Sequence, residues 1–154
     1  MASSRLDGFV SLSAELTAFK VVELVGTGQA EEFLATVDRI VGAAAVDALL
    51  EAHAGLGNLA GPARDQQLRR TIFGDGYLGP IARNLIKLWY VGIWYQLPRA
   101  WREANGARDG DETFTVSANA YTQGLLWPAV GANPAGARAP GWASWTTAPR
   151  LAVR

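Results

Sequence analysis

The feature that most restricts the fold lies near the end of the chain, at residues 127–145, with the sequence WPAVGANPAGARAPGWASW. It holds three tryptophans, three prolines and three glycines, and its only charge is Arg138. Proline lacks the backbone N–H that helix interiors and central strands need, and glycine destabilises both structures. The stretch therefore predicts irregular backbone whose indole rings pack against some other part of a protein.

The chain has 154 residues, of which 49% are hydrophobic, so we expect a single folded domain over residues 1–154. Its net charge is zero, whereas nucleic-acid-binding surfaces carry an excess of positive charge, so we expect no nucleic-acid partner. The absence of cysteine excludes disulfides and thiolate metal sites. No run of about 18 uninterrupted apolar residues exists, so we expect no transmembrane segment.

Apolar residues recur at helical spacing through the first part of the chain. We expect helices from about Ser11 or Ser13 to about Val25, with Val22 on the apolar face, and then from Thr27 to Gly42. A third helix is expected around residues 46–53 and a fourth at 62–73. The most apolar helix, PIARNLIKLWYVGIWY at 80–95, has its stripe at Ile81, Leu85, Leu88 and Trp89.

After Pro98 the sequence becomes polar and rich in turn residues, so a loop or a short hairpin fits residues 99–116. A short helix capped by Ser117 fits the residues that follow. The expected fold is all-α. It consists of an irregular bundle of about five or six helices over residues 9–97, followed by a long, largely non-regular segment rich in proline, glycine and tryptophan over residues 98–154.

Three features could carry chemistry, and each has a simpler structural interpretation. Residues 74–79 match the G-x-G-x-x-G pattern, but an apparent helix precedes them and no acid follows at the required distance, so a turn is favoured. His53, the only histidine, lies on an apolar helix side without a nucleophile motif. Asp109, Asp111 and Glu112 lack the spacing of a calcium loop and favour a solvated turn.

All six tryptophans lie between residues 89 and 145. Trp89 belongs to a helix stripe, whereas Trp101, Trp142 and Trp145 have no such stripe to bury them. Because tryptophan is enriched at interface hot spots, a permanent protein interface is the favoured interpretation. Two alternatives stay open: the segment wraps back over its own helices, or the rings form a platform for stacking sugars.

Three segments of the chain resemble a known family: FVSLSAELTAF, LIKLWYVGIW and AYTQGLLWPAVGANPAGARAPGWASWTTAP. They resemble the small subunits of bacterial FAD-dependent sugar and polyol dehydrogenases, namely sorbitol, fructose, glucose and glucoside 3-dehydrogenases. The resemblance is weaker before residue 75 and most specific at the ending. The matching positions there are Tyr121, Gly124, Leu125, Trp127, Gly131, Pro134, Gly136, Ala137, Pro140, Gly141, Ser144 and Trp145.

The resemblance implies a non-catalytic subunit that holds no cofactor, catalytic residue or metal of its own. Its partner would be a large flavoprotein of the glucose–methanol–choline (GMC) oxidoreductase type, which holds FAD and oxidises a sugar hydroxyl. The small subunit would stabilise this flavoprotein, and a cytochrome or other electron-acceptor subunit could complete the complex. Family members with a cysteine near the end differ from this chain, so the glucose or glucoside 3-dehydrogenase branch fits better than the sorbitol and fructose branches.

The expected partner-binding residues follow from this resemblance and from the aromatic ending. They are Trp89, Tyr90, Tyr121, Leu125, Trp127, Pro134, Pro140, Trp142 and Trp145, with Trp89 and Tyr90 between core and interface. The alternative function is a free-standing helical carbohydrate-binding domain, or an enzyme, that uses the aromatic tail as a platform.

The compartment depends on the start of the chain. Many members of the family begin with a twin-arginine signal, and the start MASSRLDGFVSLS has none. We therefore expect a cytoplasmic complex for the sequence as given, and a periplasmic one if such a signal has been removed.

Overall fold

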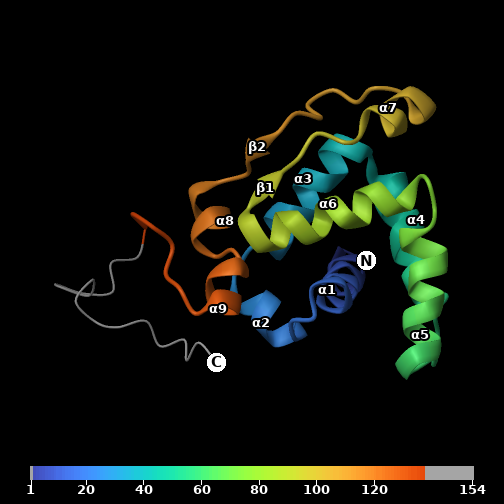
Figure 1. Cartoon of the computed structure of the whole chain (residues 1–154), viewed down its shortest axis with the longest axis horizontal. Helices are drawn as coiled ribbons and strands as arrows, with labels where there is room; N and C mark the ends of the chain where they lie inside the picture. The colour runs from blue at the N-terminus through green and yellow to red at the C-terminus, as the bar shows by residue number, and fades with distance from the viewer. Residues whose placement is uncertain (1, 138–154) are drawn as a thin grey trace.

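The computed structural model describes residues 2–137, and this part of the chain is mostly helical (Figure 1). The predicted all-α class is broadly right, although two short antiparallel strands are also present. In chain order the elements are α1 (Ala2–Thr17), α2 (Val21–Gly26), α3 (Ala30–Val41), α4 (Ala43–Ala54), α5 (Gly61–Leu68), the π-helix η1 (Arg69–Phe73), α6 (Leu78–Val91), β1 (Ile93–Trp94), α7 (Arg99–Asn105), β2 (Phe114–Thr115), α8 (Ala118–Thr122) and α9 (Leu126–Val130).

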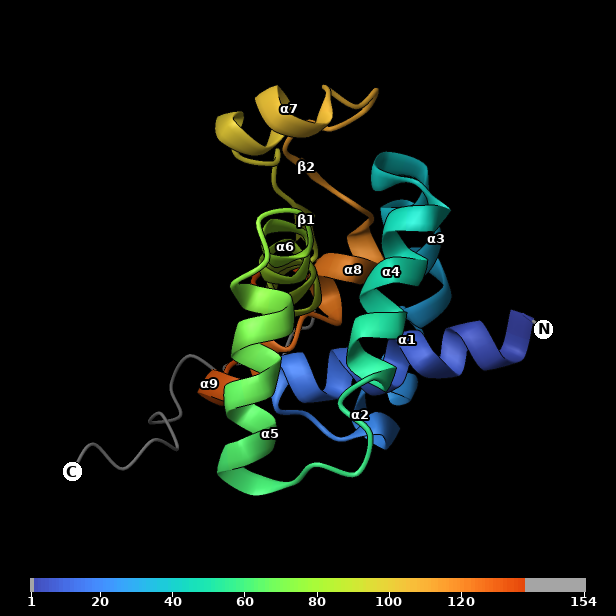
Figure 2. The ribbon, with the colours of Figure 1, turned by 90° about the vertical axis from the view of Figure 1, so that its right-hand side faces the viewer.

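Helix α6 forms the centre of the core, and α1 and α4 pack against it (Figures 1 and 2). Its predicted stripe is confirmed, because Ile81, Leu85, Leu88 and Trp89 are all at most 1% exposed. The Trp89 ring lies 4.9 Å from the Phe33 ring of α3, in an edge-to-face arrangement. Since buried aromatic side chains contribute large apolar areas, Trp89 joins three helices into one core.

The first predicted helix is wrong at its start and in its continuity. Helix α1 begins at residue 2, stops at residue 17, and gives way to the separate helix α2, which ends at residue 26, close to the predicted end. The break is at Ala18, whose φ of +61° lies in the left-handed region that side chains disfavour. Lys20 N then donates to Glu23 Oε2 at 2.7 Å, which helps α2 to begin. Because α2 takes a new direction, Val22 is 71% exposed instead of buried.

The other predicted helices are confirmed with changes at their ends. Helices α3 and α4 correspond to the second and third, and the fourth, predicted at 62–73, is α5 followed by η1. The helix predicted at 80–95 stops at residue 91, because Gly92 has a φ of +69° and closes it. Ile93 and Trp94 form β1 instead, which pairs with β2 in the register Ile93–Thr115 and Trp94–Phe114.

The chain between the two strands buries two side chains that the sequence placed differently. Trp101, which had no predicted stripe, lies on α7, is 3% exposed and stacks on Tyr77 at 5.6 Å. Asp111, expected in a solvated turn, is also 3% exposed. Its Oδ1 accepts hydrogen bonds from Trp94 Nε1 at 2.9 Å and from Leu97 N at 3.0 Å. The carboxylate is buried because it satisfies these buried donors.

Helices α8 and α9 lie at the C-terminal end of α6 (Figure 1). The predicted cap of α8 is confirmed, since Ser117 Oγ accepts from Ala120 N at 3.0 Å. Helix α9 contradicts the prediction of irregular backbone at residues 127–130, within a segment predicted to be largely non-regular. It tolerates Pro128 because the N–H groups of a first helical turn have no partner within the helix. Residues 98–137 are thus not separate from the helical body, and they add Trp101, Ala120 and Leu125 to its core.

Candidate functional site

Three of the residues expected to bind a partner are held largely by the chain itself. Trp89 is 1% exposed and Leu125 is 2% exposed. Leu125 N donates to Trp89 O at 3.0 Å, which fixes the segment between α8 and α9 on α6. Tyr90 is half-buried, and its hydroxyl donates to Thr17 O at 2.9 Å. In this structure Trp89 and Leu125 offer almost no surface to another protein.

Tyr121, Trp127 and Pro134 form a second group near the end of the described chain. Trp127 Nε1 donates to Tyr121 O at 2.8 Å, and the two rings meet edge to face at 5.4 Å. The Tyr121 hydroxyl donates to Ala135 O at 3.4 Å, and Pro134 is buried. Both rings are half-buried, so each keeps some exposed surface. Pro140, Trp142 and Trp145 lie outside the described residues.

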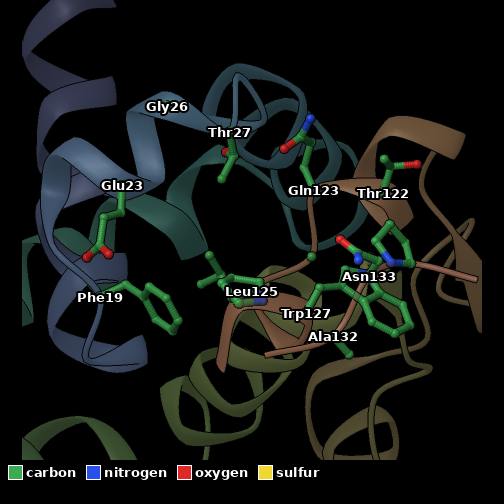
Figure 3. A pocket seen from close by; sticks show the side chains of 13 residues that line it. Phe19, Glu23, Gly26, Thr27, Thr122, Gln123, Leu125, Trp127, Ala132 and Asn133 are labelled. Carbon is green, nitrogen blue, oxygen red and sulfur yellow. The ribbon is translucent and has the colours of Figure 1, made fainter. Parts of the chain in front are cut away.

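Trp127 and Pro134 line a pocket between α2 and the segment 122–134 (Figure 3). The pocket has a volume of about 430 Å³. One wall carries Phe19 and Glu23, and the opposite wall carries Gln123 and Trp127. The described residues that line it are Phe19, Glu23, Gly26, Thr27, Thr122, Gln123, Gly124, Leu125, Trp127, Pro128, Ala132, Asn133 and Pro134. We call it the Trp127 pocket.

The polar groups of the Trp127 pocket differ in how they are satisfied. Thr27 Oγ1 donates to Leu24 O at 2.6 Å, and Thr122 Oγ1 donates to Ala118 O at 2.8 Å, so both hydroxyls are used within the chain. The side-chain amides of Gln123 and Asn133 make no hydrogen bond to any described residue. Glu23 supplies the only charge among the lining residues that lie within the described part of the chain.

A second surface lies on the other side of α2. Val21, Val22 and Val25 are 49%, 71% and 59% exposed, and we call them the valine face. Val21 and Val25 also line an apolar groove of about 550 Å³ between α1, α2 and the start of α3. The remaining residues that line this groove are Leu6, Asp7, Val10, Ser11, Gly28, Ala30 and Glu31. An exposed cluster of large aliphatic side chains is typical of an interaction site.

The only histidine of the chain belongs to an ionic cluster that joins three helices. His53 Nε2 of α4 lies 2.7 Å from Glu15 Oε2 of α1, and Arg64 of α5 donates to both Glu15 oxygens at 2.6 and 2.7 Å. These hydrogen bonds from Arg64 lower the pKa of Glu15 below its usual value and raise the pKa of Arg64. The cluster holds three helices together, and His53 is half-buried within it.

The glycine-rich motif at 74–79 covers the turn between η1 and α6, which the sequence predicted, and its last two residues, Leu78 and Gly79, already belong to α6. Asp75 Oδ1 accepts from Tyr77 N at 2.8 Å and from Leu78 N at 2.7 Å, which helps α6 to begin. Within residues 2–137 no group of three or more metal-ligating side chains is placed to hold an ion. None of the helices in this range is both long and apolar enough to cross a bilayer.

Sequence reasoning missed the valine face and most of the Trp127 pocket. The valines follow the break at Ala18, and an alanine gives no signal that a helix stops. Gln123 and Asn133 are separated from Glu23 by about a hundred residues in the printed sequence and meet it only through folding. The signal that could have drawn attention to this region was Trp127 itself, which the sequence did single out.

No protein-family model matches the chain, and neither a curated protein nor a solved structure is significantly similar to it. The resemblance of its ending to dehydrogenase small subunits therefore stays a prediction, and the function has to be argued from the two surfaces that flank α2.

Proposed function

We propose that this chain is the non-catalytic small subunit of a heteromeric FAD-dependent sugar dehydrogenase of the glucose or glucoside 3-dehydrogenase type. Its partner is a large GMC-type flavoprotein that binds FAD and oxidises a sugar hydroxyl. The small subunit stabilises that flavoprotein, and a cytochrome or other electron-acceptor subunit can take up the electrons. The identity proposed for the partner rests on the resemblance of the ending to dehydrogenase small subunits. The valine face is a surface to which this partner could bind.

The valine face is the observation that carries the proposal. Val22 is the most exposed of the three valines, and a six-residue helix presents all of them beside an apolar groove. Burying a valine side chain fully contributes about 1.5 kcal/mol, so covering this surface would stabilise a complex substantially. Glu31 lines the groove and Glu23 follows Val22 on α2, and both are exposed, which suits a partner that surrounds an apolar contact with basic side chains.

The acid–base groups of the described chain also support a structural role. Glu15, His53 and Arg64 bind one another and hold α1, α4 and α5 together. Asp111 accepts from two buried donors and Asp75 starts a helix. These groups stabilise the fold, so their arrangement does not suggest proton transfer to a substrate.

Affinity purification from the organism of origin tests the proposal. A tagged full-length chain should retain a larger protein that shows a flavin absorbance spectrum and reduces a dye when a sugar is added. The double variant Val22→Ser, Val25→Ser should lower the retained flavin by about tenfold or more, because it removes the apolar contact. Leu59→Ser is the matched control, since Leu59 is 43% exposed on the loop before α5, away from the valine face.

Three outcomes would contradict the proposal. The chain could purify without any flavoprotein, or the retained protein could lack sugar-dependent dye reduction. The valine variant could also retain as much flavin as the Leu59 control, which would place the interface elsewhere. Circular dichroism of the variants checks that the helical content is unchanged.

A further inference from the structure

We propose that the Trp127 pocket binds a neutral mono- or disaccharide. The inference goes beyond the subunit role and does not depend on the flavoprotein, because every group that it uses belongs to this chain. Its starting point is the volume of about 430 Å³, which falls within the range of about 300–1,000 Å³ typical of small-molecule sites.

The first property of the pocket is an aromatic ring held in a fixed position. Trp127 Nε1 donates to Tyr121 O at 2.8 Å, and the edge-to-face contact with Tyr121 further restricts the indole. The indole is half-buried, so part of its surface stays available on the pocket side. A sugar ring has an apolar face of C–H groups, and an immobilised indole can cover that face at little entropic cost.

The second property is a pair of amides without partners. Gln123 and Asn133 line the same pocket as Trp127, and neither side chain bonds to another described residue (Figure 3). Each amide can donate two hydrogen bonds and accept two, which matches neighbouring hydroxyl groups that both donate and accept. The position of these amides beside the indole supplies the polar groups that a sugar-stacking site needs.

The third property is the charge of the lining. Glu23 is the only charged residue among the described residues that line the pocket, and no lysine, arginine or histidine is present there. Glu23 Oε2 accepts from Lys20 N at 2.7 Å, which holds the carboxylate at the pocket wall. A carboxylate accepts hydrogen bonds from hydroxyl groups and repels anions. The site should therefore prefer neutral sugars to phosphorylated ones.

Titration calorimetry of the full-length chain with glucose, sucrose and glucose 6-phosphate tests the inference. We expect one of the neutral sugars to bind and glucose 6-phosphate to bind at least about tenfold more weakly. Gln123→Ala and Asn133→Ala should each weaken binding about three- to tenfold, the equivalent of one lost hydrogen bond. Trp127→Ala should abolish detectable binding, and Trp127→Phe should restore part of it because a ring remains.

The controls separate a binding role from a structural one. Because the amides of Gln123 and Asn133 have no partners in the described chain, removing either should leave the thermal midpoint unchanged. Asn58→Ala, at an exposed position on the loop before α5, should change neither the midpoint nor the affinity. If the chain purifies only with a flavoprotein, the difference in sugar affinity between these variants still reports on the Trp127 pocket. The flavoprotein's own sugar site is the same in all of the complexes and does not contribute to that difference.

Several results would overturn the inference. These are no binding of glucose or sucrose, equal or tighter binding of glucose 6-phosphate, or equal affinities in the pocket variants and Asn58→Ala. Tighter binding of adenosine than of either sugar would assign the ring to nucleobase stacking instead. Sugar binding by a chain that co-purifies with no flavoprotein would contradict the subunit role and leave this site standing.

Discussion

Two glycines allow the segment around α8 and α9 to lie directly on the end of α6. A side chain at Gly92 would place its Cβ 2.4 Å from Ala120 C, and one at Gly124 would place it 2.6 Å from Tyr90 O. Gly92 also has a φ of +69°, which ends the helix. These contacts fix Leu125 and thereby the wall of the Trp127 pocket, which Gly124 also lines, so the two glycines help to determine its shape.

We expect Gly92→Ala to destabilise the protein strongly. Gly131 is the matched control, because its φ of +68° is nearly the same but no atom of the described residues lies within 4 Å of an added Cβ. Gly131→Ala should cost only the conformational penalty of about 1–2 kcal/mol. Gly92→Ala should lower the free energy of unfolding by this penalty and by a further amount, because the added Cβ must displace the Ala120 backbone. Urea unfolding measures both, and equal free energies of unfolding would show that the close approach is unimportant.

The exposure of acidic residues could not be predicted from their neighbours in the sequence. Asp109 and Asp111 both sit in a turn-rich stretch, yet Asp109 is exposed and Asp111 is 3% exposed. Asp111 is buried because Trp94 Nε1 and Leu97 N need an acceptor inside the fold. These donors come from a segment 14 to 17 residues earlier in the chain, and only the strand pair brings them together.

Among the elements, α1 is tied to its neighbours by ion pairs at both ends. Near its start, Arg5 binds Asp38 of α3 at 2.7 Å and Asp47 of α4 at 2.6 Å, and the hydrogen bonds to Asp38 contribute most to raising the pKa of Arg5. Near its end, Glu15 binds Arg64 of α5. Because the break at Ala18 separates α1 from α2, these ties and the core hold α1 in place.

The Glu15 tie predicts a dependence of stability on pH. Arg64 lowers the pKa of Glu15 below its usual value of 4.5. The folded protein therefore binds this proton less readily than the unfolded chain, and the ionised carboxylate stabilises the fold above pH 4.5. That contribution should be lost as the pH falls through the lowered pKa. Glu15→Gln should lack this contribution at every pH. The difference in free energy of unfolding between the wild type and Glu15→Gln should therefore shrink as the pH falls.

Urea unfolding between neutral and acidic pH measures this difference for the wild type and Glu15→Gln. Glu51→Gln is a suitable control, because Glu51 is exposed on α4 and forms no ion pair with a described residue. A constant difference between wild type and Glu15→Gln across the pH range would show that the pKa of Glu15 is not linked to folding.

At the scale of the whole molecule, the described residues pack around one buried core, and two surfaces lie on either side of α2. The Trp127 pocket lies between α2 and the segment 122–134, and the groove beside the valine face lies between α1, α2 and α3. Residues 98–137 pack on the helical body and reach the core through Trp101 and Leu125. The expected partner contacts of Pro140, Trp142 and Trp145 fall beyond this part of the chain.

Deleting residues 138–154 should separate folding from assembly. Because residues 2–137 form one contiguous buried cluster among themselves, we expect the shortened chain to keep its helical circular dichroism spectrum and its cooperative unfolding. On the proposed function, its yield of co-purified flavoprotein should fall by about tenfold or more, since two expected tryptophan anchors are lost. The full-length double variant Trp142→Ala, Trp145→Ala should reproduce much of this loss. Full recovery of flavoprotein by the shortened chain would contradict a partner role for the ending.

The sequence by itself determined the helical class, the central stripe of α6 and the Ser117 cap, because periodic burial and capping depend on residues close together in the chain. It also singled out Trp127. Tertiary structure decided the break at Ala18, the burial of Trp101 and Asp111, and the meeting of Glu23, Gln123 and Asn133 around Trp127. Each of these depends on contacts between residues far apart in the chain, which no local pattern records.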